Sequence, residues 1–132
     1  MIYHAMIYYF CDISQLDISQ GDIYMREELK KSYLPMSETG YYILLSLKEP
    51  RHGYGIILYV KEITKSRITL GAGTIYGTLT KFEKDKLIVP TGEEDRRKLY
   101  QLTETGFWLL EQELNRIDEL YASGHSILGG ER

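Results

Sequence analysis

Residues 73–106, GTIYGTLTKFEKDKLIVPTGEEDRRKLYQLTETG, carry the pattern that decides the fold. The first part, residues 74–84, predicts a helix with two distinct faces. Ile75, Leu79 and Phe82 fall at i, i+4 and i+7, so they share one apolar face. A different face is polar and basic, with a glycine where a bulky side chain would stand: Thr74, Gly77, Lys81 and Lys84. Such a face can approach another surface closely.

The second part of this stretch predicts a two-stranded hairpin. Residues 87–89 are typical of a strand, and residues 96–102 are typical of the strand that returns. Residues 91–95 predict the turn between them, because they are polar and acidic and include Gly92. Pro90 is compatible with this arrangement, since a two-stranded hairpin has free edges.

Two further helices are predicted upstream. Ser37 followed by Glu38 predicts an N-cap with an acid in the first turn, and Pro50 ends the buried helix that residues 41–47 indicate. The next helix is expected over residues 53–65, with His52 shaping the turn before it. Four side chains are expected to supply its apolar contacts: Tyr54, Ile57, Leu58 and Ile63. A short turn, residues 66–73, then leads to the two-faced helix.

A last helix is predicted after Thr103, which is expected to cap it. Five apolar residues recur at spacings of 3, 4, 3 and 4, as in the a/d seam of a coiled coil: Phe107, Leu110, Leu114, Ile117 and Tyr121. Acids line the flanks of this seam: Glu111, Glu113, Asp118 and Glu119. The pattern favours a dimerisation helix, because the small core is already supplied by the earlier elements. The alternative is an amphipathic helix that packs on its own domain.

The order of helix, helix, turn, helix and hairpin predicts a winged helix-turn-helix. The expected fold is therefore mainly α with a small β-hairpin, a winged helix-turn-helix followed by a C-terminal dimerisation helix. The major groove of a DNA duplex is about 12 Å wide and admits one helix, which residues 74–84 would supply. Arg96, Arg97 and Lys98 lie where the wing leads into its return strand, and guanidinium groups pair well with phosphate oxygens. Double-stranded DNA is the partner that this pattern predicts.

Residues 36–106 also resemble the PadR family of bacterial transcriptional regulators. The matching stretches are SETGYYILLSL at 37–47, HGYGI at 52–56, GTIYGTL at 73–79, FEKDKLI at 82–88 and RRKLYQLTETG at 96–106. The resemblance implies a dimeric repressor whose third helix enters the major groove, with Tyr76 at the family's characteristic tyrosine. It also implies that basic residues of the wing contact phosphates or the minor groove and that the last helix carries dimerisation.

The resemblance further implies that a small aromatic effector could control DNA release. Some family members bind planar aromatic compounds between the dimerisation helices and the first helix. One drug-sensing branch has a tryptophan in the middle of the last helix, where this chain has Ile117, and the only tryptophan here, Trp108, lies near the helix start. Trp108 and Ile117 are therefore the effector-binding candidates, with simple packing as the alternative for Trp108.

The candidate DNA-binding residues form one set: Thr74, Tyr76, Gly77, Lys81, Lys84, Arg96, Arg97 and Tyr54. Each has a structural alternative. Tyr54 and Tyr76 could be packed core aromatics, and the two lysines could belong to a merely solvated face. The two arginines could balance the acids at residues 93–95.

Charge is unevenly distributed along the chain, although the net value is only −3. Residues 1–24 carry three acids and no base, residues 25–102 carry 14 bases against 10 acids, and residues 103–132 carry two bases against six acids. We expect these segments to be an N-terminal extension, the DNA-binding domain, and a dimerisation helix with a tail. The extension is either a flexible or partner-dependent arm or a segment upstream of a natural start at Met25.

Other classes of function find little support in the sequence. Cys11 is the single cysteine, His4 and His125 are isolated, and no metal-ligand spacing is present. No Gly-rich phosphate loop, nucleophile elbow or HExxH motif occurs, so neither an enzyme nor a cofactor is expected. No run of about 20 apolar residues predicts a membrane span. No Lys or Arg precedes the apolar start, which argues against a signal peptide and favours the cytoplasm.

These observations together predict a ligand-responsive repressor that acts as a homodimer on a pseudo-palindromic operator. The alternative is a winged-helix adaptor that binds proteins and does not recognise DNA. The acidic tail segments and the acidic wing tip favour that alternative.

Overall fold

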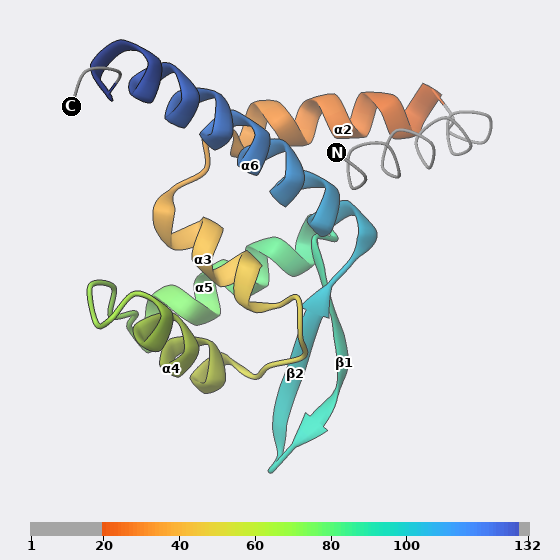
Figure 1. Ribbon diagram of the computed structural model, residues 1–132. Coiled ribbons are helices and arrows are strands. Elements are labelled where there is room, and N and C mark those ends of the chain that lie inside the picture. Colours follow the sequence, from red (N-terminus) through yellow and green to blue (C-terminus); the bar gives the residue numbers. More distant parts are fainter. Residues whose placement is uncertain (1–19, 130–132) are drawn as a thin grey trace. The chain divides into compact units, whose positions relative to one another are not determined.

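The computed structural model describes residues 20–129 of the 132-residue chain (Figure 1). These residues fall into two units, which meet in sequence between Leu34 and Pro35. His4 and Cys11 lie outside the described residues. None of the helices in residues 20–129 is long and apolar enough to cross a membrane.

The first unit contributes one described helix, α2 (Gln20–Tyr33). Asp22 lies in its first turn and two lysines lie in its last, which suits the helix dipole. Two ion pairs link successive turns: Glu27–Lys30 at 3.9 Å and Glu28–Lys31 at 3.7 Å. Residues 20–24, which the sequence analysis assigned to the N-terminal extension, form the first turns of this helix.

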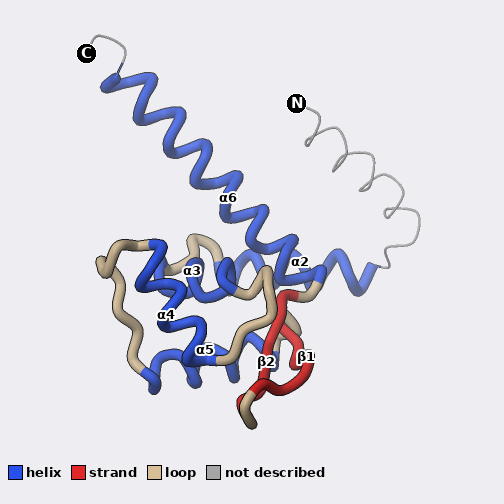
Figure 2. The backbone as a smooth tube through the Cα atoms, turned by 60° about the horizontal axis from the view of Figure 1, so that its bottom comes forward, coloured by secondary structure: helices blue, strands red, loops and turns tan. Residues whose placement is uncertain are grey.

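The second unit has the predicted element order. It consists of α3 (Glu38–Ser46), α4 (Gly53–Ile63), α5 (Ala72–Lys84), β1 (Ile88–Glu94), β2 (Arg97–Leu102), α6 (Glu104–Gly124) and a π-helical turn (His125–Gly129). Helices α3, α4 and α5 gather together and the hairpin extends beside them (Figure 2). The winged helix-turn-helix prediction is thereby confirmed.

Side-chain caps begin three of these helices. Ser37 Oγ accepts a hydrogen bond from the Gly40 backbone N–H at 3.0 Å, as the sequence predicts. Thr103 Oγ1 caps α6 in the same way, at 3.1 Å from the N–H three residues on. His52 shapes the start of α4 directly, because its Nδ1 accepts the Gly55 N–H at 2.9 Å. Each cap satisfies a donor that the helix itself leaves without a partner.

The core confirms the apolar face of α5 and corrects that of α4. Ile75, Leu79 and Phe82 are all buried. In α4, however, Tyr54, Leu58 and Ile63 are exposed and Ile57 is only half-buried, so these side chains do not form the core face. The buried positions are instead Gly53, Ile56 and Val60, spaced 3 and 4. Helix α4 is apolar on most of its circumference, so two faces with helical spacing compete in the sequence.

The hairpin turns later than the sequence predicts. Strand β1 continues through the expected turn, and Glu94 pairs with Arg97, which leaves Asp95 and Arg96 as a two-residue turn. Both turn residues have positive φ, 52° and 64°, as a two-residue hairpin of the I′ type requires. Gly92, with φ 156°, pairs with Leu99 directly after the register shift, where Thr91 is the extra residue, so Gly92 belongs to a bulge in the strand and not to the turn.

Helix α6 starts against the backbone that precedes β1. The Thr103 N–H donates to the Leu87 carbonyl at 3.0 Å, and the Thr103 hydroxyl donates to the Lys86 carbonyl at 2.7 Å. A Cβ atom on Gly106 would lie 2.1 Å from that Leu87 oxygen, so only glycine fits there. The first turn of α6 is therefore fixed to the base of the wing.

Candidate nucleic-acid interface

The outward face of α5 is open, as the sequence predicts. Its four members are all exposed: Thr74, Gly77, Lys81 and Lys84. Apart from Gly77 itself, its two neighbours in the chain and the nearby backbone of α5, no described atom lies within 4 Å of the place where a Cβ on Gly77 would stand. The fold does not require glycine at this position, so its effect is to let another surface come close to the helix backbone.

Tyr76 lies between α5 and the start of α4. Its side chain is 58% exposed. A Cβ on Gly53 would come 3.1 Å from the Tyr76 ring and 3.2 Å from Ile75, so the ring lies against the first turn of α4. Tyr76 is therefore neither fully packed nor fully free: one edge of its ring packs on Gly53, while the rest of the ring is accessible.

The wing places a cation beside the first turn of α4. The Arg97 guanidinium carbon lies 5.3 Å from the centre of the Tyr54 ring, within the range of a cation–π interaction. Tyr54 is 51% exposed, so it is not a core tyrosine. The structure thus brings Tyr54 and Arg97 together, and Gly53 connects this pair to Tyr76 on α5.

The remaining basic residues of the wing differ in their surroundings. Arg96 is exposed in the turn at the wing tip, one residue before β2 begins. Lys98 pairs with Glu83 of α5 at 3.9 Å and lies 5.5 Å from the Tyr100 ring centre, so its charge is partly engaged within the protein. Within residues 20–129, no ion pair joins Arg96 or Arg97 to the three acids at residues 93–95.

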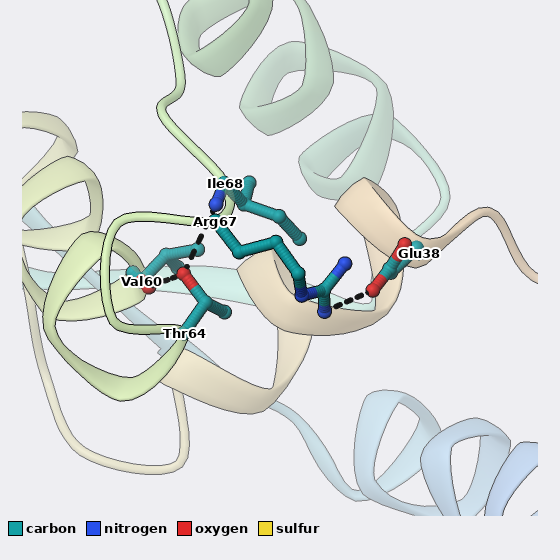
Figure 3. A network of polar contacts seen from close by, with 5 residues as sticks. All are labelled: Glu38, Val60, Thr64, Arg67 and Ile68. Atoms are coloured by element: carbon teal, nitrogen blue, oxygen red, sulfur yellow. Dashed lines mark hydrogen bonds and ion pairs between the residues drawn. The ribbon is translucent and has the colours of Figure 1, made fainter.

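A polar network fixes the turn between α4 and α5 (Figure 3). The Thr64 hydroxyl donates to the Val60 carbonyl at 2.7 Å and accepts from the Ile68 N–H at 3.2 Å. Arg67 donates to Glu38 in the first turn of α3, and this hydrogen bond lowers the pKa of the Glu38 carboxyl. The network thus connects the turn before α5 to the first turn of α3. Glu38 was predicted in that first turn, but its partner Arg67 was not identified, because it lies 29 residues away in the chain.

The predicted dimerisation residues divide into two groups. Phe107, Leu114 and Tyr121 are exposed and Ile117 is half-buried, whereas Leu110 is buried within a single chain. Further apolar residues on the same helix and in the turn after it are exposed and were not in the predicted seam: Leu120, Ile127 and Leu128. Of the two effector candidates, Trp108 is also half-buried. The roles of these residues stay predictions.

The acid Glu113 corrects the sequence analysis, which placed it on the flank of the seam. Its side chain is only 1% exposed. One carboxylate oxygen accepts the Met36 backbone N–H at 2.6 Å, and the other pairs with Arg116. An acid among polar neighbours on a helix resembles a surface residue in sequence, so its burial could not be foreseen.

Comparison with known proteins identifies a family whose model matches about half of the chain. A family model described as the transcriptional regulator PadR-like family matches residues 42–112. The transcriptional regulator YqjI from Escherichia coli K12 is 31% identical over 71 residues, which make up 54% of this chain and 34% of that protein. The chain spans between 20% and 34% of the length of the curated relatives it matches.

Solved structures agree with this match. A PadR family transcription regulator from Clostridium difficile R20291 is 27% identical with a TM-score of 0.56, over 68% of this chain and 98% of that chain. Bacillus subtilis PadR in complex with operator DNA is 29% identical with a TM-score of 0.51, over 59% of this chain and 47% of that chain. The family match at residues 42–112 includes every DNA-binding candidate and ends before the exposed part of α6.

Proposed function

Because the chain belongs to the transcriptional regulator PadR-like family, we propose that it binds double-stranded DNA sequence-specifically as a homodimer and represses transcription. Helix α5 would enter the major groove, with Thr74, Tyr76 and Gly77 facing the base edges. Lys81, Lys84 and the wing arginines would contact the phosphate backbone, which fixes position and supplies salt-dependent affinity. Such a regulator would act in the cytoplasm.

One observation carries this proposal, namely that the wing, the first turn of α4 and α5 are linked by contacts at exposed side chains. Arg97 of the wing lies over the Tyr54 ring, the Tyr76 ring of α5 lies against the adjacent Gly53, and both tyrosines are more than half exposed. A cation held over an aromatic ring keeps its hydrogen-bond donors available for phosphate oxygens. The adjoining open position at Gly77 would let the groove approach the helix.

Selection of bound duplexes from a random pool at near-physiological salt tests the proposal. A homodimer should enrich an inverted repeat, whose half-sites reflect the symmetry of the protein. Arg97→Ala should weaken binding to all duplexes and reduce the slope of log K against log salt by about 1. Lys61→Ala, the same charge change at the far end of α4, is the control and should leave the slope unchanged.

Tyr76→Ala tests sequence recognition separately. If Tyr76 contacts bases, its loss should change the preference among sequences, by about 1–3 kcal/mol at the affected position. An equal loss of affinity on every duplex would argue against base contact. Failure of the unmodified protein to bind duplexes in a salt-dependent way would instead favour the adaptor function, for which the exposed acids Glu93 and Glu94 on the wing are the supporting observation.

Response to a ligand is the least constrained part of the proposal. Trp108 and Ile117 are half-buried on α6, and an aromatic effector bound between the helices of the dimer would contact one or the other of them, because nine residues place them on opposite sides of the helix. Trp108 is the only tryptophan of the chain, so its fluorescence reports on this place alone. Titration with a planar aromatic cation such as ethidium should quench that fluorescence to saturation, and unchanged emission would contradict an effector site there.

A further inference from the structure

Two specific contacts, one at each end of the packed part of α6, join this helix to different elements of the winged helix. The first is Gly106, whose Cα faces the Leu87 carbonyl so closely that a Cβ would lie 2.1 Å from the oxygen. The second is Glu113, whose carboxylate accepts the Met36 N–H at 2.6 Å, just before the N-cap of α3. Seven residues separate these positions on the helix, which is about two turns, or roughly 10 Å.

The second connection uses a buried carboxylate, a group that is energetically costly to remove from water. The Glu113 carboxylate is 1% exposed, and removing a charge from water costs several kcal/mol unless partners replace the hydration. Both oxygens have such partners, since Arg116 binds one and the Met36 N–H binds the other. A leucine at this position would avoid the cost of burying a charge, but it would leave the Met36 N–H without its acceptor. A buried carboxylate with a defined partner on another element is therefore better suited to fixing a geometry than to adding stability.

Glu113 also marks the end of the packed part of α6. Leu114, the next residue, is exposed, and the following two and a half turns carry the exposed apolar residues Leu120 and Tyr121. A helix held at one place can pivot about it, whereas two attachments define its direction. Gly106, Leu109 and Leu110 hold the start of α6, and Glu113 is the last buried attachment before the free part, so it is the contact best placed to control the direction of that part.

From this geometry we propose that Glu113 is a positioning residue that sets the direction of α6 and thereby the spacing of the two half-sites that a dimer recognises. The inference rests on the proposed function, since α6 must carry dimerisation for its direction to matter. The free segment from Leu114 to Gly124 is about 16 Å long, so a small pivot moves the two α5 helices of a dimer relative to each other. A shift of about 3.4 Å corresponds to one base-pair step.

The first test measures the direction of α6 without DNA. Spin labels at Glu62→Cys on α4 and Ala122→Cys on α6, both exposed, are introduced in a Cys11→Ser background, and labelled chains are diluted with unlabelled ones. Pulsed dipolar spectroscopy then reports the distance distribution within one chain. We expect the distribution to widen in the order unmodified, Glu113→Gln, Glu113→Leu, because the amide keeps an acceptor for Met36 and leucine does not. Glu119→Leu, the same change at an exposed acid of α6, should leave it unchanged.

The second test measures half-site spacing on an inverted repeat with spacers lengthened or shortened by one base pair. The unmodified protein should lose at least about tenfold in affinity for each step, or about 1.4 kcal/mol. Glu113→Leu should bind neighbouring spacings within about threefold of one another, while its affinity for a single half-site changes by less than about twofold. A purely structural role would lower the melting temperature and weaken binding at all spacings alike.

Distances and spacing profiles that match those of the unmodified protein in both variants would overturn the proposal. If Glu113→Leu does not fold, Glu113→Gln decides alone, since a broader distribution supports the positioning role and an equal one overturns it. Absence of duplex binding by the unmodified protein would reject the proposed function instead. The distances within one chain would still decide whether Glu113 sets the direction of α6.

Discussion

The two halves of α6 are parts of one continuous helix, yet they have opposite surroundings. In the first half, Gly106, Leu109, Leu110 and Glu113 are buried. In the second half the large apolar side chains Leu114, Leu120 and Tyr121 are exposed. The first half is thus part of the winged-helix core, and the second half presents apolar surface that stays exposed among residues 20–129. A helix of this kind can transmit the orientation of one domain to a partner bound further along it.

The a/d pattern alone does not distinguish these halves. The same 3, 4, 3, 4 spacing includes buried Leu110 and exposed Leu114, which are one turn apart. Periodicity reports which residues share a face of a helix, but it does not tell whether the chain itself or a second copy covers that face. The following experiments separate the two halves, in order of expected effect.

Alanine in place of the two helical glycines of α6 should give the largest contrast. Gly106→Ala places a Cβ against the Leu87 carbonyl and should lower the free energy of unfolding by about 4 kcal/mol or more. Gly124→Ala meets no atom within 4 Å and should raise it by about 0.5–1 kcal/mol, because alanine favours the helix. Urea denaturation measures both, and equal effects would contradict the division of the helix.

Truncation of leucines extends the comparison to side chains. Leu109 is fully buried, so Leu109→Ala should cost about 3 kcal/mol through lost burial and the cavity left behind. Leu120→Ala, at a position that is 57% exposed, should cost less than about 1 kcal/mol in dilute protein. Thermal and urea unfolding at low concentration provide the measurement. A large cost for Leu120→Ala under these conditions would show that the second half packs within its own chain.

Introducing a charge into the second half of α6 tests whether a second copy of the chain covers the apolar residues there. Leu114→Glu should weaken the dimer by at least about 100-fold, since burial of a leucine is worth about 1.5–3 kcal/mol in each chain. Asn115→Glu, an exposed neighbour, should leave association unchanged. Sedimentation velocity over a concentration series gives both dissociation constants. A monomeric unmodified protein, or equal effects of the two changes, would reject the dimer interface.

The smallest effect concerns the tyrosine that faces the boundary between the halves. Partial burial raises the pKa of the Tyr41 hydroxyl, and the negative charges of Tyr42, Glu113 and Asp118 raise it further. The folded state therefore favours the protonated phenol. Stability from this group is present below about pH 10 and should fall as the pH rises through the raised pKa. Melting temperatures from pH 8 to 11 should decline less steeply for Tyr41→Phe, and parallel curves would contradict this account.

Prediction from the sequence succeeded where the polar and apolar residues of a helix lie on clearly separate faces. The two faces of α5 differ in polarity at every position, so both the buried and the exposed sets could be predicted. In α4 nearly all faces are apolar, and the choice of Tyr54 and Leu58 for the core was wrong, because nothing local distinguishes them from Ile56 and Val60. Caps at Ser37 and Thr103 were predictable because they depend on residues only three positions away.

Features that depend on distant partners could not be predicted. The burial of Glu113 follows from a backbone donor 77 residues away, and the Arg67–Glu38 pair joins segments separated by 29 residues. The prediction of the wing turn was wrong for a different reason. Gly92 suggested the turn, but the strand accommodates it beside a bulge at Thr91, and Asp95 and Arg96 adopt the positive φ values that glycine was expected to supply.

The empty space above Gly77 has an evolutionary consequence. A side chain added there would meet open space, so most replacements other than proline would not disturb the fold. If α5 contacts DNA as proposed, mutations there could retarget a duplicated copy of the gene to new promoters without first unfolding its product. The same property makes Gly77 a suitable place for a saturation library in which binding preference is varied independently of folding.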